Sequence, residues 1–173
     1  MAKKILVPID GSEASVDALK YAVKMVEVVG KDAVIVALEV MDINKYQFAA
    51  DAIDLSTQDK LLEAIKKDAE DHLKKAKNIC NERGVNVETV IRQGFAHEEI
   101  IKHAEDNEDI KLIVMGASGK GFIDQHILGS ITSRIIQEVG RKLPCPVMIT
   151  PHRKEAENKR WNFNDLNEIE GCN

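Results

Sequence analysis

The sequence has 173 residues, of which 44 % are hydrophobic and 31 % charged, and its formal net charge is -5. This length and balance fit a single globular domain, and the acidic charge excludes the broad basic surface that general nucleic-acid binding needs. No apolar run approaches the length of a membrane span, and the N-terminus has no signal region. The cysteines, Cys80, Cys145 and Cys172, are too scattered for a disulfide framework or a metal site. We therefore expect a cytoplasmic protein with neither nucleic acid nor a membrane as its partner.

The N-terminal part predicts two buried strands joined by a helix. Lys3–Ile9 is a nearly continuous apolar run, as expected of a parallel strand covered on both faces, and Ala33–Val40 is another. Between them Ser12 is a natural N-cap, and apolar residues recur at helical spacing until Gly30. Asp10 follows the first strand and has two open interpretations. In one its carboxylate holds a ribose hydroxyl or a phosphate-bound cation; in the other it caps the turn before the helix.

The middle of the chain predicts a loop, a long helix, a strand and a shorter helix. Residues 42–57 have weak periodicity and are expected to form a long loop. Gln58–Arg83 carries apolar residues three or four apart and lysines on the opposite face, which predicts one amphipathic helix. We place His72 at the surface or boundary of this helix and not among the ligands. Val85–Arg92 alternates as a third strand, and a helix follows through Asp106.

The functional prediction depends on the segment Leu112–Arg134. A buried strand stops at Gly116, Gly119 and Lys120 follow, and Gly129-Ser130 opens a new helix. The apolar residues of that helix recur at Ile131, Ile135 and Val139. Glycines let the backbone turn sharply and approach a ligand, and a helix N-terminus offers unpaired N–H groups and a positive dipole end to an anion. We interpret the segment as a cradle for nucleotide phosphates; the alternative is a plain structural loop.

Two common phosphate-binding motifs do not fit this segment. A P-loop needs Gly-x4-Gly-Lys-[Ser/Thr], but Lys120 is followed by Gly121. The dinucleotide fingerprint needs a third glycine where Asp124 stands. The segment therefore predicts a different kind of glycine loop.

The C-terminal part predicts one more strand and a tail. Val147–Thr150 is a short strand, and the proline at its start suits an edge position. Residues 152–173 are charged and rich in asparagine, and they are expected to form a tail. One domain over residues 1–151 is therefore expected, with no second domain after it.

Strands and helices alternate along the chain, which predicts a three-layer α/β/α domain with a five-stranded parallel sheet. Right-handed crossovers in the strand order 3-2-1-4-5 leave a crevice beyond the carboxyl ends of strands one and four. Asp10 follows strand one and Gly116 follows strand four. These two distant segments are therefore expected to meet at one crevice.

The glycine pattern, Gly116-x2-Gly119-x9-Gly129-Ser130, resembles that of the universal stress protein family, specifically its ATP-binding branch. Pro8-Ile9-Asp10 near the N-terminus and Pro144-Cys145-Pro146-Val147 before the last strand are also typical of that family. The resemblance covers about Lys4–Thr150 and implies an adenine nucleotide alpha hydrolase-like fold that binds ATP, together with Mg²⁺ or Mn²⁺. The nucleotide-binding residues that it implies are Pro8, Ile9, Asp10, Val40, Met115, Gly116, Gly119, Lys120, Gly129, Ser130 and Ile131. The base would lie near Val40, and Asp10 would reach a metal ion through the phosphates.

The resemblance also implies a partner and a set of functions. Members of the family usually dimerise through the last strand, here Val147–Thr150, which agrees with the tendency of an exposed edge strand to pair. The first functional hypothesis is a dimeric, ATP-loaded regulatory module in the stress response. The alternatives are a slow ATPase or autokinase, and a nucleotide-free dimerisation module. No general base is identifiable, so we expect slow turnover at most and name no catalytic residue.

Overall fold

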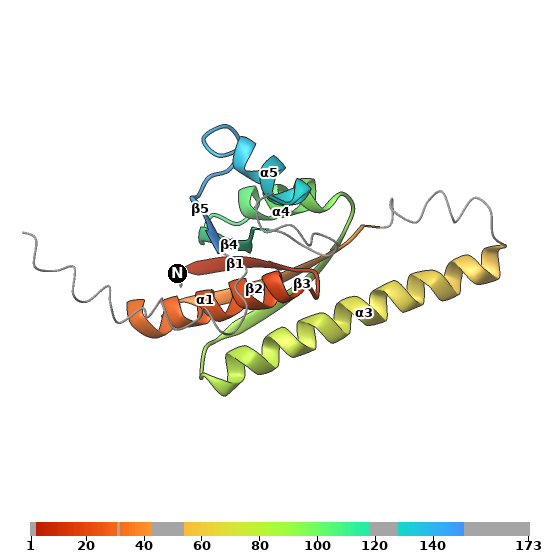
Figure 1. Ribbon diagram of the computed structural model, residues 1–173, viewed down its shortest axis with the longest axis horizontal. Coiled ribbons are helices and arrows are strands. Elements are labelled where there is room, and N and C mark those ends of the chain that lie inside the picture. Colours follow the sequence, from red (N-terminus) through yellow and green to blue (C-terminus); the bar gives the residue numbers. More distant parts are fainter. Residues whose placement is uncertain (1–2, 31, 43–53, 118–127, 151–173) are drawn as a thin grey trace, which may run out of the picture.

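The computed structural model describes residues 3–30, 32–42, 54–117 and 128–150 (Figure 1). Its elements are β1 (Lys4–Ile9), α1 (Glu13–Val29), β2 (Val34–Met41), α3 (Leu55–Glu82), β3 (Val87–Gln93), α4 (Ala96–Glu105), β4 (Ile110–Gly116), α5 (Ser130–Gln137) and β5 (Val147–Thr150). The strands pair in parallel in one sheet with the order β3-β2-β1-β4-β5. The predicted fold class and strand order are therefore confirmed. The predicted tail and residues 43–53 of the predicted loop lie outside the described part of the chain.

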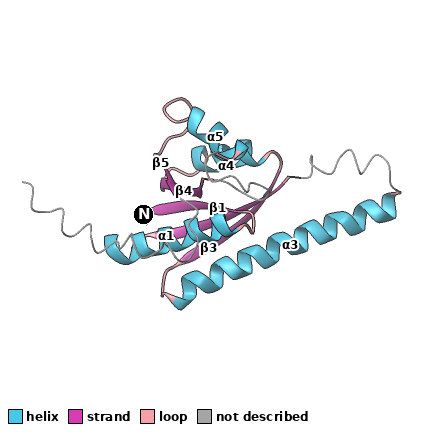
Figure 2. Cartoon of the chain, viewed as in Figure 1, coloured by secondary structure: helices cyan, strands magenta, loops and turns pink. Residues whose placement is uncertain are grey.

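The sheet lies between two helical layers. Helices α1 and α3 cover one face and α4 and α5 cover the other, and Figure 2 shows the strands enclosed between them. In β1, Val7 packs with the α1–α3 layer and Leu6 with the α4–α5 layer, and both are fully buried. Because successive side chains of a strand point to opposite faces, a strand covered on both faces must be apolar throughout. This explains the continuous apolar runs in the sequence.

Two helix ends differ from the sequence prediction. Helix α3 begins at Leu55, ahead of the predicted Gln58, because the Asp54 carboxylate accepts hydrogen bonds from the Thr57 N–H (3.1 Å) and hydroxyl (2.7 Å). Helix α5 ends at Gln137, so Val139 lies outside it and is 45 % exposed. The chain turns away at Gly140, whose φ of 79° favours glycine. The apolar spacing alone therefore predicted too late a start for one helix and too late an end for the other.

Two further features concern the length of the helices and the chemistry of the cysteines. Within the described ranges, none of the helices combines the length and the apolar character needed to cross a bilayer. Burial raises the pKa of the Cys80 thiol to about 11 and raises that of Cys145 as well. Both thiols are free and buried, so they act as small apolar side chains of the core. Cys172 lies outside the described residues.

Acid is expected to loosen the first turn of α3. Hydrogen bonds from Ser56 and Thr57 lower the pKa of Asp54 from its usual 3.8 to about 2. Because the folded pKa is depressed, the cap contributes fully above about pH 4 and is lost as the pH falls through about 2. The amide chemical shift of Thr57, followed by NMR, should therefore change with a midpoint near pH 2 and not near pH 3.8.

Asp54→Asn provides the matched control, because asparagine is an equally good N-cap without a titrating group. The acid transition at Thr57 should vanish in this variant. An unshifted midpoint in the unsubstituted protein would contradict the prediction.

Candidate functional site

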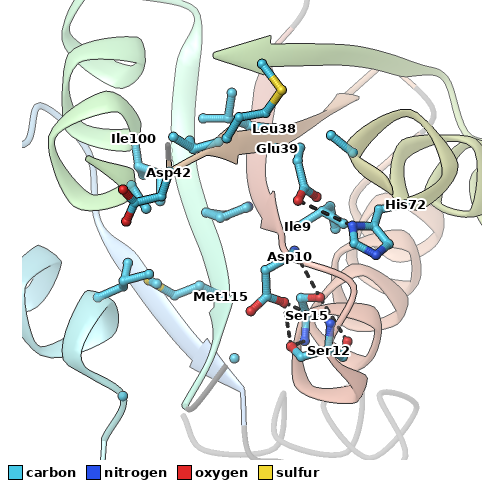
Figure 3. Close-up of a pocket in the computed structure, with 18 of the residues that line it drawn as sticks. Ile9, Asp10, Ser12, Ser15, Leu38, Glu39, Asp42, His72, Ile100 and Met115 are labelled. Atoms are coloured by element: carbon cyan, nitrogen blue, oxygen red, sulfur yellow. Dashed lines mark hydrogen bonds and ion pairs between the residues drawn. The ribbon is translucent and has the colours of Figure 1, made fainter. Parts of the chain in front are cut away.

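A pocket lies beyond the carboxyl ends of β1, β2 and β4 (Figure 3). Its volume is about 280 Å³, and residues of α3 and the first residues of α4 and α5 complete its lining. The pocket adjoins the boundary between β1 and β4, where the strand order changes direction. Ligands of open α/β sheets bind at this kind of boundary, because the connecting chains diverge there to opposite faces.

Every predicted site residue within the described part of the chain lines this pocket. These residues are Pro8, Ile9, Asp10, Val40, Met115, Gly116, Gly129, Ser130 and Ile131. The other two, Gly119 and Lys120, lie outside the described residues. The backbone N–H of Gly129 donates to the Ala117 carbonyl at 2.8 Å, so the two ends of the glycine segment lie together.

Asp10 caps the turn between β1 and α1. Its Oδ1 accepts hydrogen bonds from the Ser12 N–H (2.9 Å) and hydroxyl (2.6 Å). The Ser12 hydroxyl in turn accepts from the Ser15 N–H at 3.1 Å, which caps α1. Gly11 lies inside this turn with a φ of 76°, a left-handed conformation that glycine adopts without strain. The capping interpretation is therefore correct, and the same carboxyl group also lines the pocket.

The structure gives a reason for glycine at position 116 that differs from the one expected from the sequence. It is the last residue of β4, pairs with Thr150 and does not have a positive φ, so its own backbone conformation does not require glycine. A Cβ atom there would lie 2.8 Å from the Ala14 carbonyl oxygen and 2.9 Å from the Ala14 Cβ. Glycine at this position therefore permits close packing of α1 against β4.

The N-terminus of α5 opens at the pocket. Gly129 is its N-cap, with φ -59° and ψ 151°, and it provides no side-chain cap for the first N–H groups. The buried Thr132 hydroxyl donates to the Gly116 carbonyl at 3.0 Å, which anchors this end of the helix to β4. Uncapped N–H groups and the positive end of the helix dipole together favour an anion. The geometry therefore suits a phosphate group beside Gly129 and Ser130.

Comparisons with known proteins agree with this architecture. Residues 1–151 match the model of the Universal stress protein family. The chain belongs to this family. Universal stress protein MJ0531 of Methanocaldococcus jannaschii is 31 % identical over 156 residues, covering 88 % of this chain and 84 % of that protein. Universal stress protein MJ0577 of the same organism is also 31 % identical, over 163 residues that cover 88 % of this chain and 97 % of that protein.

Solved structures share the fold of this universal stress protein. The structure of MJ0577 matches with a TM-score of 0.72 and 28 % identity, covering 90 % of this chain and 99 % of that one. An Arabidopsis thaliana family member with AMP bound matches with a TM-score of 0.62 and 17 % identity, covering 89 % and 94 %. A universal stress protein in complex with cAMP matches with a TM-score of 0.57 and 18 % identity, covering 87 % and 97 %. At these lower identities the likeness concerns the fold alone.

Helix α3 contributes a wall of the pocket that sequence analysis missed. The lining residues of this universal stress protein from α3 are Ile65, Asp68, Ala69 and His72. His72 follows Ala69 by three positions, so the helical period that identified Ala69 as inward-facing also placed His72 near that face. A second signal in the sequence that could have indicated this pocket wall was Glu39, a lone charge inside the apolar run of β2. Its side chain is buried, with 8 % of the residue exposed, and it also lines the pocket.

Glu39 and His72 form a pair at the pocket wall. Nδ1 of His72 lies 3.3 Å from Oε1 of Glu39, and Figure 3 shows the two side chains facing each other beside Asp10. The other charged residues in the described part of the chain that line the pocket, Asp10, Asp42 and Asp68, are acidic. Among the described residues, no group of three or more His, Cys, Asp or Glu side chains is placed to hold a metal ion. The residues present therefore fit a cation only if phosphates supply most of its oxygen ligands, as is common for Mg²⁺.

Proposed function

We propose that this universal stress protein belongs to the ATP-binding branch of the family and works as a dimeric, nucleotide-loaded regulatory module in the cytoplasmic stress response. The observation that supports this most directly is the convergence of three groups on one pocket: the start of α5, where Gly129 offers no side-chain cap, the Asp10 residue and the end of β2. We assign residues 1–151 to the nucleotide-binding domain.

The assignment of the nucleotide follows from the chemistry of each wall. Phosphates lie at Gly116, Gly129, Ser130 and Ile131, where backbone N–H groups and the helix dipole stabilise negative charge. The ribose lies at Asp10, whose carboxylate can accept hydrogen bonds from hydroxyl groups. The base lies at Val40, where the strand end offers an apolar surface. Structures of the same fold with AMP and with cAMP support an adenine nucleotide as the ligand.

Mg²⁺ or Mn²⁺ would accompany the polyphosphate and neutralise part of its charge. Asp10 is the residue that we assign to it, and it supplies one carboxylate, in keeping with Mg²⁺ sites that combine one or two carboxylates with substrate phosphates. The Ser12 hydrogen bonds hold Oδ1 of Asp10 in place, so this carboxylate is oriented before any ligand arrives.

The proposal is tested on the purified protein. Mass spectrometry of small molecules released on denaturation should find ATP, and calorimetric titration of the stripped protein should detect ATP binding. Asp10→Ala should weaken binding, whereas Asp109→Ala, at the opposite end of β4 and paired with Lys4, should not. A folded protein without detectable binding at millimolar ATP would refute the assignment.

The same sample distinguishes the alternative functions. An ATPase or autokinase needs a group that orients the attacking nucleophile, and rapid ATP turnover abolished by Asp10→Ala would establish one. A nucleotide-free dimerisation module would sediment as a dimer of the 19.3 kDa chain without retaining ATP. We propose dimerisation through β5, because it is an edge strand with the partly exposed residues Val147, Met148 and Ile149.

A further inference from the structure

We infer that Glu39 and His72 are positioning residues for the nucleotide: the His72 ring, held by Glu39, covers Gly11 and so fixes the turn that presents Asp10 to the ribose. This inference rests on the proposed function. It assigns a role to two side chains outside the glycine pattern, on β2 and α3.

The first observation is the burial of a charge. Among the described residues, Glu39 is the only charged residue that is buried, with 8 % of the residue exposed. Burial of a carboxylate is costly unless a partner compensates for it, and His72 at 3.3 Å is such a partner. In the sheet register Glu39 lies opposite Ile9, the residue before Asp10. The pair therefore lies directly beside the turn that follows β1.

The second observation is the position of the imidazole ring. A Cβ atom added to Gly11 would lie 2.5 Å from both Cδ2 and Cε1 of His72, and closer still to Nε2. The ring thus occupies the space in which a side chain at this position would stand. Gly84 has a similar left-handed φ of 66° and nothing within 4 Å of its added Cβ. The close cover of Gly11 is therefore a specific contact and not a property of every glycine turn.

The consequence is preorganisation of the ribose-binding group. Glycine is the most flexible residue, and Gly11 links Asp10 to Ser12, the donor of both hydrogen bonds to Oδ1. A ring packed on Gly11 limits the conformations of this link before the ligand binds. Binding then costs less conformational entropy, which raises affinity for ligands that contain ribose. The affinity for a ligand made only of phosphate should not rise, because the contacts of such a ligand lie at α5.

Substitution of His72 separates the effect on ligands that contain ribose from the effect on ligands made only of phosphate. His72→Ala is expected to weaken ATP and AMP binding about tenfold and to leave competition by inorganic tripolyphosphate unchanged. His72→Asn keeps a side-chain donor near the position of Nδ1 but has no ring, and it should behave like His72→Ala. The double variant Glu39→Gln with His72→Phe restores a ring without leaving a buried charge, but the ring lacks the Glu39 contact, so this variant should recover only part of the ATP affinity. His103→Ala is the control, because His103 contacts Arg92 and does not line the pocket.

A measurement without nucleotide keeps the inference separate from the proposed function. Hydrogen exchange at the Ser12 amide, which donates to Asp10, should be faster in His72→Ala and unchanged in His103→Ala. Unchanged exchange would overturn the inference whether or not ATP binds. ATP binding that His72→Ala does not weaken, or an equal loss for tripolyphosphate, would overturn it while the proposed function stands. A protein that binds no ATP but shows the faster exchange would refute the proposed function and with it the role in nucleotide binding.

Discussion

Gly129→Val is expected to weaken ATP binding strongly in a protein that remains folded. The backbone of Gly129 has φ -59° and ψ 151°, a conformation open to every residue, so valine adds no backbone strain. Gly129 is buried and lines the pocket at the start of α5, so we expect the added methyl groups to take up space that the phosphate needs to approach the N–H groups of α5. We expect a loss of about 100-fold or more in ATP affinity, which corresponds to about 2.7 kcal/mol.

Calorimetric titration with ATP, together with thermal unfolding of the nucleotide-free protein, measures both parts of this prediction. Gly129→Ser is the matched variant, because a serine N-cap accepts hydrogen bonds from the same N–H groups that the phosphate would use. Serine should therefore stabilise the free protein by a few tenths of a kcal/mol and weaken ATP binding at the same time. Unchanged ATP retention by a folded Gly129→Val protein would rule out phosphate binding at this helix end.

Gly116→Ala is expected to destabilise the protein by about 1–3 kcal/mol, the usual cost of overpacking. The new Cβ would lie 2.8 Å from the Ala14 carbonyl oxygen, and this atom belongs to the backbone of α1 and cannot rotate away. Relief requires a shift of the first turn of α1, which adjoins Ser12 and the capped Asp10. Weaker ATP binding should accompany the loss of stability.

Urea denaturation gives the free energy of unfolding for this comparison. Gly140→Ala is the control, because its added Cβ has nothing within 4 Å and Gly140 is not a pocket residue. That variant carries only the strain of a left-handed φ, of 79°, and should leave ATP affinity unchanged. A Gly116→Ala protein as stable as the unsubstituted one would show that α1 can move away from β4 at no cost.

The architecture and one side of the site were predictable from the sequence because they depend on local pattern. A strand covered on both faces must be apolar along its length, so β1 and β2 appeared as continuous apolar runs. The alternation of strands and helices then restricted the topology to a few choices, and the glycine pattern marked Gly116 and Gly129. Helix ends were less predictable, because α3 begins where the Asp54 side chain can cap it and not where its apolar stripe begins.

Tertiary structure alone decided which distant residues share the pocket wall. Glu39 and His72 are 33 positions apart, and neither residue carries a local signal that names the other as its partner. Their contact exists because α3 packs against β2 in the folded protein. The role of Gly116 was hidden for the same reason: its neighbour, Ala14, belongs to another layer of the fold. Sequence periodicity therefore determined which face of each element is buried, whereas the packing of elements against one another determined which side chains meet.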